Sequence, residues 1–267
     1  ERRAGGAGAR GASGAAVRDV CCGADEVALR TDEGEIRARI VVAADGLGSA
    51  VRRRLGLEGA PAPRRRFGVR RHYAVEPWSD HVEVHWAEGV EAYVTPVAPR
   101  LIGVAFLWDE ARLGQQRFDR LLRRFPALRE RLAGAEAASA DRGAGPLGRS
   151  ASARARGRVL LLGDAGGYVD ALSGEGIALA FRQALDLGPD LPDAVVRGDP
   201  ALGRWRRETE RAFRHHALLA RTLLLLSDAP RLRRRVVRAL GARPRIFEAA
   251  LAHFGDGSAR AAAQRRA

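Results

Sequence analysis

The chain of 267 residues contains no methionine, no lysine and no asparagine, and only two cysteines. All 46 basic residues are therefore arginine. This bias is typical of a GC-rich genome, so the net charge of +14 is weak support for a polyanionic partner. The arginines fall in short scattered runs that match no nucleic-acid-binding module. We expect no nucleic-acid partner, although an arginine-rich binding protein stays an alternative.

Cysteine and long apolar runs are both scarce. The two cysteines, Cys21 and Cys22, are adjacent, which disfavours a disulfide between them because disulfide geometry is specific. We expect buried or half-buried free thiols and a reducing, cytoplasmic setting. The longest apolar run, Leu218–Leu226, is interrupted by Arg221 and Thr222 and is far shorter than the roughly 20 residues that cross a bilayer. No transmembrane segment is predicted, and peripheral membrane contact stays open.

The N-terminal part of the chain has the pattern of β-strands. Strands are predicted at Val17–Cys22, Glu26–Thr31 and Glu35–Ala44, with a hairpin turn at Asp32–Gly34. In the third strand "EIRAR" alternates, as in a half-exposed strand, whereas "IVVAA" is continuously apolar, as in a buried parallel strand. This segment is predicted to pass from a surface meander into a covered central sheet.

The middle of the chain predicts an antiparallel sheet after the linker "GAPAPRRR" (59–66). Its strands are expected at Phe67–Val75, His81–Trp86, Val90–Val97 and Leu101–Trp108. An amphipathic helix over 117–132 is expected to kink or divide at Pro126. Beyond it we expect a buried strand at 158–162, a helix at 174–187, and helices over 199–254 that divide near 228–230 and 241–244.

Two short apolar strands each end in an acid beside glycine, in "VVAADGLGS" (41–49) and "LLLGDAGG" (160–167). Ligands of open α/β sheets bind beyond the carboxyl ends of the strands. A carboxylate there accepts hydrogen bonds from ribose or ribityl hydroxyls, and glycine lets the backbone approach a phosphate. The helix that begins near Gly174 presents free N–H groups and a positive dipole end. Each turn alone is an ordinary turn signal; the pair, with a sheet between them, predicts a ligand site.

These segments resemble the FAD-dependent oxidoreductases of the para-hydroxybenzoate hydroxylase fold, and most of all the geranylgeranyl-reductase-like branch. "VVAADGLGSAVRRRLGL" (41–57) is similar to the family's DG motif, and "GRVLLLGDAGGYVDALSGEGIALAFRQA" (157–184) is similar to its GD motif and following helix. "EAYVTPVAPRLIGVAF" (91–106) resembles the sheet strand over the flavin. The resemblance implies an α/β (α+β) fold with a partial FAD-binding Rossmann-like sheet, an inserted antiparallel sheet and C-terminal helices.

The resemblance also implies which residues bind FAD. Asp164 would bind the ribityl chain, and Asp45 would lie near the pyrophosphate together with Gly46. Arg52 would be a charge partner of the pyrophosphate, its alternative being a solvated helix arginine. The residues that would let the backbone pass close to the cofactor are Gly163, Ala165 and Gly167. Those that would open the helix pointing at the flavin ring are Gly174, Glu175, Gly176 and Ile177.

The implied organisation is an FAD-binding part at 1–60 and 150–190, a substrate domain at 61–149, a helical region at 191–255 and a tail at 256–267. The family's first unit, a strand, a G-x-G-x-x-G turn and a helix, has no counterpart. "GGAGARGASG" (5–14) has the glycines without an apolar strand before it or a periodic helix after it. Together with the absent methionine, this predicts that the chain is the C-terminal part of a longer protein.

The predicted function is FAD-dependent oxidation or reduction of an apolar or aromatic small molecule, with NAD(P)H as electron donor. Double-bond reduction and monooxygenation both stay open, and halogenation is disfavoured because that branch's paired-tryptophan motif is absent. An inactive remnant of such an enzyme is the alternative beside the arginine-rich binding protein. No catalytic residue is assigned, because flavin supplies the redox chemistry.

Two groups of side chains in the predicted sheet have competing interpretations. His81, Glu83 and His85 alternate along one strand and are interpreted as a polar face rather than a metal site. Tyr93 and Trp86 are candidates for lining a substrate pocket, with core packing as an equal alternative.

Overall fold

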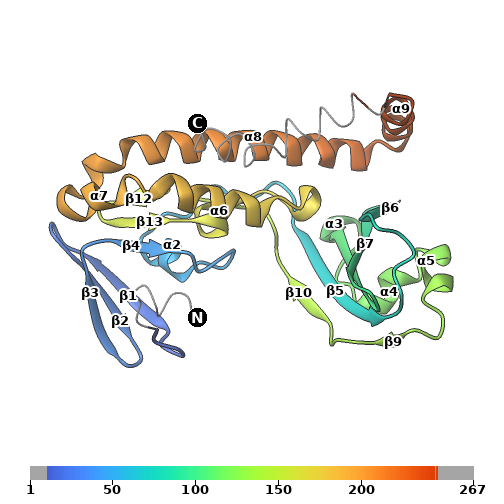
Figure 1. Cartoon of the computed structure of the whole chain (residues 1–267), viewed down its shortest axis with the longest axis horizontal. Coiled ribbons are helices and arrows are strands. Elements are labelled where there is room, and N and C mark those ends of the chain that lie inside the picture. The colour runs from blue at the N-terminus through green and yellow to red at the C-terminus, as the bar shows by residue number, and fades with distance from the viewer. Residues whose placement is uncertain (1–10, 244, 246–267) are drawn as a thin grey trace.

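The computed structural model describes residues 11–243 and residue 245 (Figure 1). The predicted tail at 256–267, the last part of the predicted helical region, and the first six residues of "GGAGARGASG" lie outside the described residues. The N-terminal strands are β1 (Val17–Cys22), β2 (Val27–Thr31), β3 (Gly34–Ala38) and β4 (Val41–Ala43). The first three form an antiparallel meander.

The predicted strand at Glu35–Ala44 is two strands, because its halves pair with different partners. β3 pairs with β2 in the meander, whereas β4 pairs in parallel with β13 (Val159–Leu161). Val41 is opposite Val159 and Ala43 is opposite Leu161. The predicted passage from a meander to a central sheet is therefore confirmed.

Both faces of β13 are buried, whereas Val42 on one face of β4 is exposed. Val159 and Leu161 are fully buried in one core with residues of the meander, whereas the alternating Leu160 is buried in a second core with Leu187 and Trp205. The prediction of buried or half-buried cysteines is wrong, although both are free thiols. Cys21 and Cys22 are both exposed, because they end β1, an edge strand of the meander.

The predicted antiparallel sheet is confirmed. Its main strands are β5 (Arg66–Ala74), β6 (Glu83–Ala87), β7 (Val90–Ala98) and β8 (Leu101–Asp109). The strand order is β10-β5-β8-β7-β6, with β9 pairing with β5. The short later strands are β9 (Glu136–Ala137), β10 (Arg142–Ala144), β11 (Arg149–Ser150), β12 (Ala155–Arg156) and β14 (Gly167–Tyr168).

One face of this sheet carries its core. Val94, Val104 and Phe106 point to the same side and are almost fully buried. The helices α4 (Phe118–Leu122) and α5 (Pro126–Arg131) cover that side with Phe118, Leu121 and Leu128. Pro126 is the first residue of α5, so the predicted division of the helix is confirmed. Proline suits this position because a helix's first N–H has no partner inside the helix.

The remaining helices lie mostly in the C-terminal half of the described chain. They are α2 (Ala50–Arg54), α3 (Glu110–Leu113), α6 (Gly176–Leu187), α7 (Leu191–Arg197), α8 (Gly203–Asp228) and α9 (Pro230–Gly241), with 3₁₀ turns η1 (Gly163–Gly166), η2 (Ala171–Ser173) and η3 (Asp199–Leu202). Figure 1 shows α8 running along α6 and extending toward the antiparallel sheet. Among the residues that the structure describes, no helix is long and apolar enough to span a membrane.

The sheet core supplies the first prediction. We expect Phe106→Ala to lower the free energy of unfolding by about 3–5 kcal/mol, because Phe106 is fully buried against Phe118 and Phe125. Urea denaturation followed by tryptophan fluorescence measures this change. Val97→Ala, at a half-exposed side chain on the opposite face, is the control and should cost less than about 0.5 kcal/mol. Equal losses in the two variants would contradict this description of the core.

Candidate functional site

The two acidic turns lie at the same edge of the central sheet. β4 and β13 are parallel neighbours, and each is followed directly by its turn, at Asp45–Gly46 and at Gly163–Asp164. Neighbouring parallel strands end at the same edge of a sheet. The fold therefore brings together two turns that are more than a hundred residues apart in the sequence. The predicted ligand site beside them stays a prediction.

The first turn leads into α2. Ser49 caps the helix, since its Oγ accepts a hydrogen bond from the Arg52 N–H at 3.0 Å. The carboxylate of Asp45 accepts a hydrogen bond from the Val51 N–H at 3.2 Å, so Asp45 also serves the helix start. Gly46 has a φ of +76°, and no atom lies within 4 Å of where its Cβ would be. The backbone there borders open space.

Arg52 links the two turns. Its side chain is almost fully buried, so the alternative of a solvated helix arginine is wrong. The guanidinium donates to the carbonyl of Leu47 at 2.8 Å and to that of Ala165 at 2.9 Å, with a longer contact to the Asp164 carbonyl. Burial lowers the Arg52 pKa. These contacts give Arg52 a structural task, and its predicted contact with a pyrophosphate stays a prediction.

The second turn packs tightly on α6. Gly163 has a φ of +62°, and a Cβ there would lie 3.1 Å from the Cβ of Ala180. The Gly163 N–H donates to Oε1 of Gln183 at 2.8 Å. A Cβ on Gly166 would lie 3.0 Å from the carbonyl oxygen of Leu161, so Gly166 has no room for a side chain. The glycines therefore serve close packing of the turn as well as the open side of the site.

Asp164 has a half-buried carboxylate that makes no hydrogen bond with the described residues. Burial raises its pKa, which the nearby His216 partly opposes. An ionised carboxylate that is partly removed from water without a partner is costly. The geometry therefore fits a ligand that donates hydroxyl hydrogen bonds to Asp164.

The start of α6 lies beside this carboxylate. A Cβ on Gly176 would be 3.7 Å from Oδ1 of Asp164 and 3.3 Å from the ring of Tyr168. Glu175 occupies the N-cap position without capping the helix through its side chain, so the first N–H groups of α6 have no side-chain acceptor. Gly174 precedes it in the left-handed conformation. Ile177 is 75% exposed and points away from the helix packing.

The loop between the second turn and α6 is fixed to the antiparallel sheet by a buried ionic cluster. Arg66 of β5 donates to Asp170 at 2.8 Å and to Glu91 of β7 at 2.6 Å. Ser227 of α8 donates its hydroxyl to Glu91. Burial acts to lower the Arg66 pKa, but the two carboxylates outweigh it and raise it. Burial, together with Glu91, raises the pKa of Asp170 despite the opposing charge of Arg66.

Two further contacts hold the same loop. Asp170 accepts a hydrogen bond from the Leu172 N–H at 3.1 Å, and Tyr93 of β7 donates its hydroxyl to the Leu172 carbonyl at 3.0 Å. Leu172 packs with Leu107 of β8 in a small core between the loop and the sheet. This second face of the sheet, opposite to its main core, is therefore directed toward the loop.

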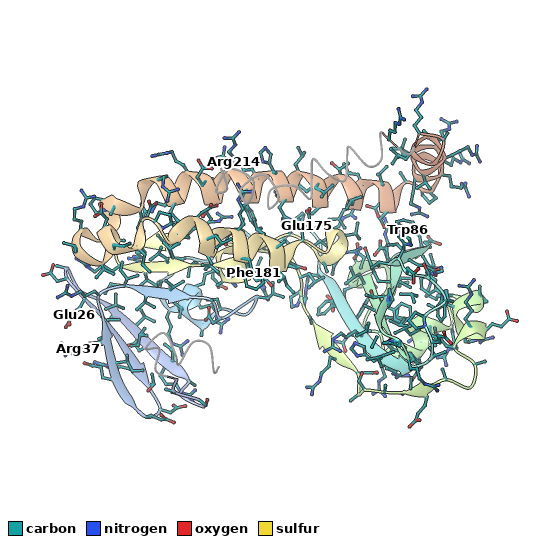
Figure 2. All side chains as sticks on the ribbon, in the orientation of Figure 1. Glu26, Arg37, Trp86, Glu175, Phe181 and Arg214 are labelled. Atoms are coloured by element: carbon teal, nitrogen blue, oxygen red, sulfur yellow. The ribbon has the colours of Figure 1, made fainter. Side chains whose placement is uncertain are left out.

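His216 of α8 is buried beside the start of α6. Its Nδ1 lies 3.5 Å from a carboxylate oxygen of Glu175, and neither ring nitrogen makes a hydrogen bond with the described residues. Figure 2 shows Glu175 at the start of α6. The longest helix of the described chain thus reaches the site.

The register of the sheet shows on which face each remaining candidate residue lies. Trp86 is opposite Glu91, and Val84 is opposite Tyr93, so these four residues share the second face. Glu83 and His85 lie on the core side instead, where Glu83 accepts from the Trp78 indole N–H and contacts His85 at 3.1 Å. His81 precedes the strand. Among the described residues no group of His, Cys, Asp and Glu is arranged to hold a metal ion.

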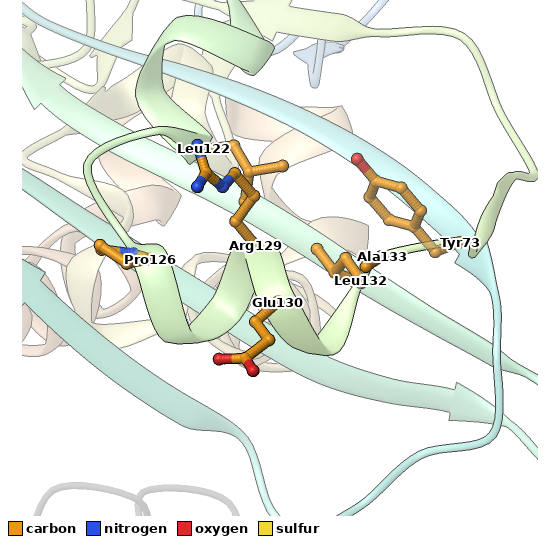
Figure 3. Close-up of a pocket in the computed structure, with 7 residues that line it drawn as sticks. All are labelled: Tyr73, Leu122, Pro126, Arg129, Glu130, Leu132 and Ala133. Atoms are coloured by element: carbon orange, nitrogen blue, oxygen red, sulfur yellow. The ribbon is translucent and has the colours of Figure 1, made fainter.

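A pocket of about 530 Å³ lies beside α5 (Figure 3). Leu122, Pro126, Arg129 and Tyr73 are among its lining residues. It shares no residue with the two turns or with the start of α6. We therefore assign it no part in the candidate site.

Comparison with protein families identifies the class. Residues 23–215 match the family described as "FAD binding domain". This match covers well over half of the chain and includes both acidic turns and α6. The chain belongs to this FAD-binding family. No curated protein sequence matches the chain significantly.

Several solved structures have a similar fold. The flavin-dependent halogenase CmlS has a TM-score of 0.71 at 20% identity, over 80% of this chain and 42% of that chain. The Diels-Alderase PyrE3 of pyrroindomycin biosynthesis has a TM-score of 0.71 at 23% identity, over 90% and 55%. The anhydrotetracycline hydroxylase OxyS of Streptomyces rimosus has a TM-score of 0.68 at 24% identity, over 90% and 51%. The chain spans about half the length of these proteins.

Several residues of the site carried no signal in the sequence. Gln183 lies mid-helix, and Arg66 lies in an arginine run, so neither stood out. Asp170 and Glu91 are far apart in the chain and meet only because the sheet folds against the loop. The buried His216 is adjacent to the exposed His215 on α8, and nothing in the sequence distinguishes the two. The spacing of Asp170 before Leu172 was the one local hint, since it is the pattern of a capped turn.

The ionic cluster gives the second prediction. We expect Arg66→Met to lower the free energy of unfolding by about 3–5 kcal/mol, because it leaves Glu91 and Asp170 buried without their cation. The neighbouring Arg65→Met removes an exposed ion pair with Glu110 and should cost at most about 1 kcal/mol. Urea denaturation of both variants makes the comparison. Similar losses of unfolding free energy in the two variants would contradict a stabilising role for the buried cluster.

Proposed function

We propose that the chain is the flavin- and substrate-binding part of an FAD-dependent monooxygenase that acts on an apolar or aromatic small molecule. The observation that carries this proposal is the half-buried Asp164 carboxylate, which has no hydrogen bond and lies beside the open N-terminus of α6. Membership of the FAD-binding family supports the same cofactor.

The residues of the site fit FAD in two ways. Asp164 accepts hydrogen bonds from ribityl hydroxyls, and the N–H groups at the start of α6 suit an electron-rich edge of the ring system. The glycines at 46, 174 and 176 keep the surroundings of the two turns free of side chains. Ala165 and Gly167 hold the second turn in place behind Asp164. When bound, the flavin supplies the redox chemistry.

The second face of the antiparallel sheet is the proposed substrate surface. It combines the aromatic side chains of Trp86 and Tyr93 with the small residues Gly103 and Ala105 on the same face. A flat apolar molecule suits such a surface. The similarity to an anhydrotetracycline hydroxylase favours hydroxylation, with NAD(P)H as the electron donor.

Reduction of a carbon–carbon double bond is the second candidate. It is favoured by the resemblance of the segment at 157–184 to the geranylgeranyl-reductase-like branch. The two candidates differ in one observable: the hydroxylase consumes oxygen in proportion to product, whereas the reductase turns over without oxygen.

We further propose that a strand–GxGxxG–helix unit precedes this chain in the complete protein. Ile177, Phe181 and Leu185 recur on one side of α6 and are each more than half exposed. Figure 2 shows Phe181 on the side of α6 away from α8. β4, the edge strand of the central sheet, has an exposed Val42. A parallel strand on β4 with a helix beside α6 would cover both, and the helix N-terminus would hold the pyrophosphate.

The third prediction concerns Asp164→Asn in the complete protein. The loss of a charged acceptor should weaken FAD binding by about 1.5–3 kcal/mol, or roughly ten- to a hundredfold. Quenching of flavin fluorescence during titration measures the affinity. Asp193→Asn, which changes an exposed carboxylate on α7, is the control and should leave FAD affinity unchanged. Unchanged affinity in Asp164→Asn would overturn the assignment of the cofactor site.

The same substitution should stabilise the FAD-free protein. The folded pKa of Asp164 lies above its ordinary value of 3.8, so the folded state binds the proton more tightly than the unfolded state. The cost of the carboxylate is therefore absent at low pH and develops as the pH rises through the folded pKa. Asp164→Asn should raise the melting temperature at pH 7, and the gain should shrink as the pH falls toward 3.8. A pH-independent gain would contradict this account.

The fourth prediction concerns the 267-residue chain alone. We expect it to bind FAD at least tenfold more weakly than the same chain preceded by the proposed unit, because fixed N–H donors for the pyrophosphate are missing. Gel filtration with flavin fluorescence read across the protein peak compares the two. A monomeric chain that carries stoichiometric FAD would show that the unit is dispensable and that the proposed cofactor site is wrong.

A further inference from the structure

A groove of about 920 Å³ lies between the segment Ser150–Ala155 and one side of α8. Its lining includes five arginines and a single acidic residue, Glu210. The arginines are Arg154, Arg206, Arg207, Arg211 and Arg214. Figure 2 labels Arg214 on α8. The groove contains none of the residues assigned to the flavin site.

The positive charge of the groove is poorly compensated by the described residues. Glu210 is shared, because one of its oxygens accepts from Arg154 at 2.8 Å and the other accepts from Arg214 at 3.0 Å. Arg207 and Arg211 are exposed at one side of the groove. A concave surface lined by charges of one sign concentrates their field and attracts counter-ions. Arginines scattered over a convex surface do not have this effect to the same degree.

Arg154 is the buried member of the set. Its side chain is only 10% exposed, its guanidinium lies 4.0 Å from the ring centroid of Phe213, and its Nε makes no hydrogen bond with the described residues. Burial lowers the pKa of Arg154 and also that of Arg206. The Arg154 guanidinium is thus held largely out of water, and Glu210, its one carboxylate partner in the groove, is shared with Arg214. An anion in the groove would relieve that cost.

The groove lies behind the second acidic turn. A Cβ on Gly167 would be 3.3 Å from the ring of Phe213, and a Cβ on Gly166 would be 3.6 Å from the side chain of Arg154. The floor of the groove therefore touches the turn that carries Asp164. The backbone of this turn lies between the groove and the proposed flavin site.

We propose that this groove binds the phosphate groups of a small phosphorylated molecule. Guanidinium groups match phosphate oxygens with paired hydrogen bonds, and several of them converge here from a helix and a facing segment. The volume lies within the range of small-molecule sites and accommodates a nucleotide-sized molecule. The site is separate from the proposed flavin site.

Isothermal titration of the chain with inorganic pyrophosphate tests the proposal at constant ionic strength. We expect saturable binding that Arg207→Gln/Arg211→Gln weakens at least about tenfold, since two charge-assisted contacts are lost. Arg231→Gln/Arg234→Gln, which removes two exposed arginines of α9, is the matched control and should change binding less than about twofold. Glu210→Gln should tighten binding several-fold, because it removes the acidic residue of the groove.

The remaining comparisons distinguish the sources of phosphate. ADP binding more tightly than pyrophosphate would identify a nucleotide, whereas equal affinities would identify the phosphates alone, and either result supports the site. Absence of saturable binding, or equal weakening by both double variants, would overturn the proposal. Binding of single-stranded oligonucleotides that strengthens with length and exceeds that of ADP would also overturn it.

Discussion

The buried guanidinium of Arg66 holds together the parts of the chain on which the site depends. It joins β5 to Glu91 of β7 and to Asp170 of the loop before α6, while Ser227 brings the end of α8 to the same cluster. Loss of this one cation would leave two buried carboxylates without a compensating charge, which is strongly destabilising. The position of the antiparallel sheet relative to the loop follows from this contact. The proposed substrate surface is directed toward the proposed flavin site through this same contact.

A second arginine links the two acidic turns in the same way. Arg52 fills the space between the two turns and donates to carbonyls on both, so that neither turn moves independently of the other. With the backbone fixed in this way, the Asp164 carboxylate is held beside the start of α6 without a partner. A site that keeps an unsatisfied group in place is organised for a ligand before the ligand arrives. Two arginines thus act as structural cross-links rather than as surface charge.

The sequence predicted the elements better than the contacts between them. Periodicity located the strands of the meander, β4, β13, the main strands of the antiparallel sheet and the division of a helix at Pro126, because local pattern decides these features. It did not locate the short strands β9, β10, β11, β12 and β14. The two acid–glycine turns pointed to the candidate site only as a pair at the ends of apolar strands, because each turn alone is an ordinary turn signal. The sequence could not separate Arg66 and Arg52 from 44 other arginines, since burial and pairing depend on residues distant in the chain. It also predicted buried or half-buried cysteines, because an apolar strand pattern does not show whether the strand lies at the edge of its sheet.

The central claim is that FAD lies between Asp164 and the start of α6, and a crystal structure of the complete protein grown with FAD tests it most directly. The account predicts ribityl hydroxyls within hydrogen-bonding distance of the Asp164 carboxylate. It also predicts the flavin ring between the N-terminus of α6 and the sheet face that carries Tyr93. FAD bound elsewhere, or an Asp164 carboxylate that faces only water in the complex, would contradict it.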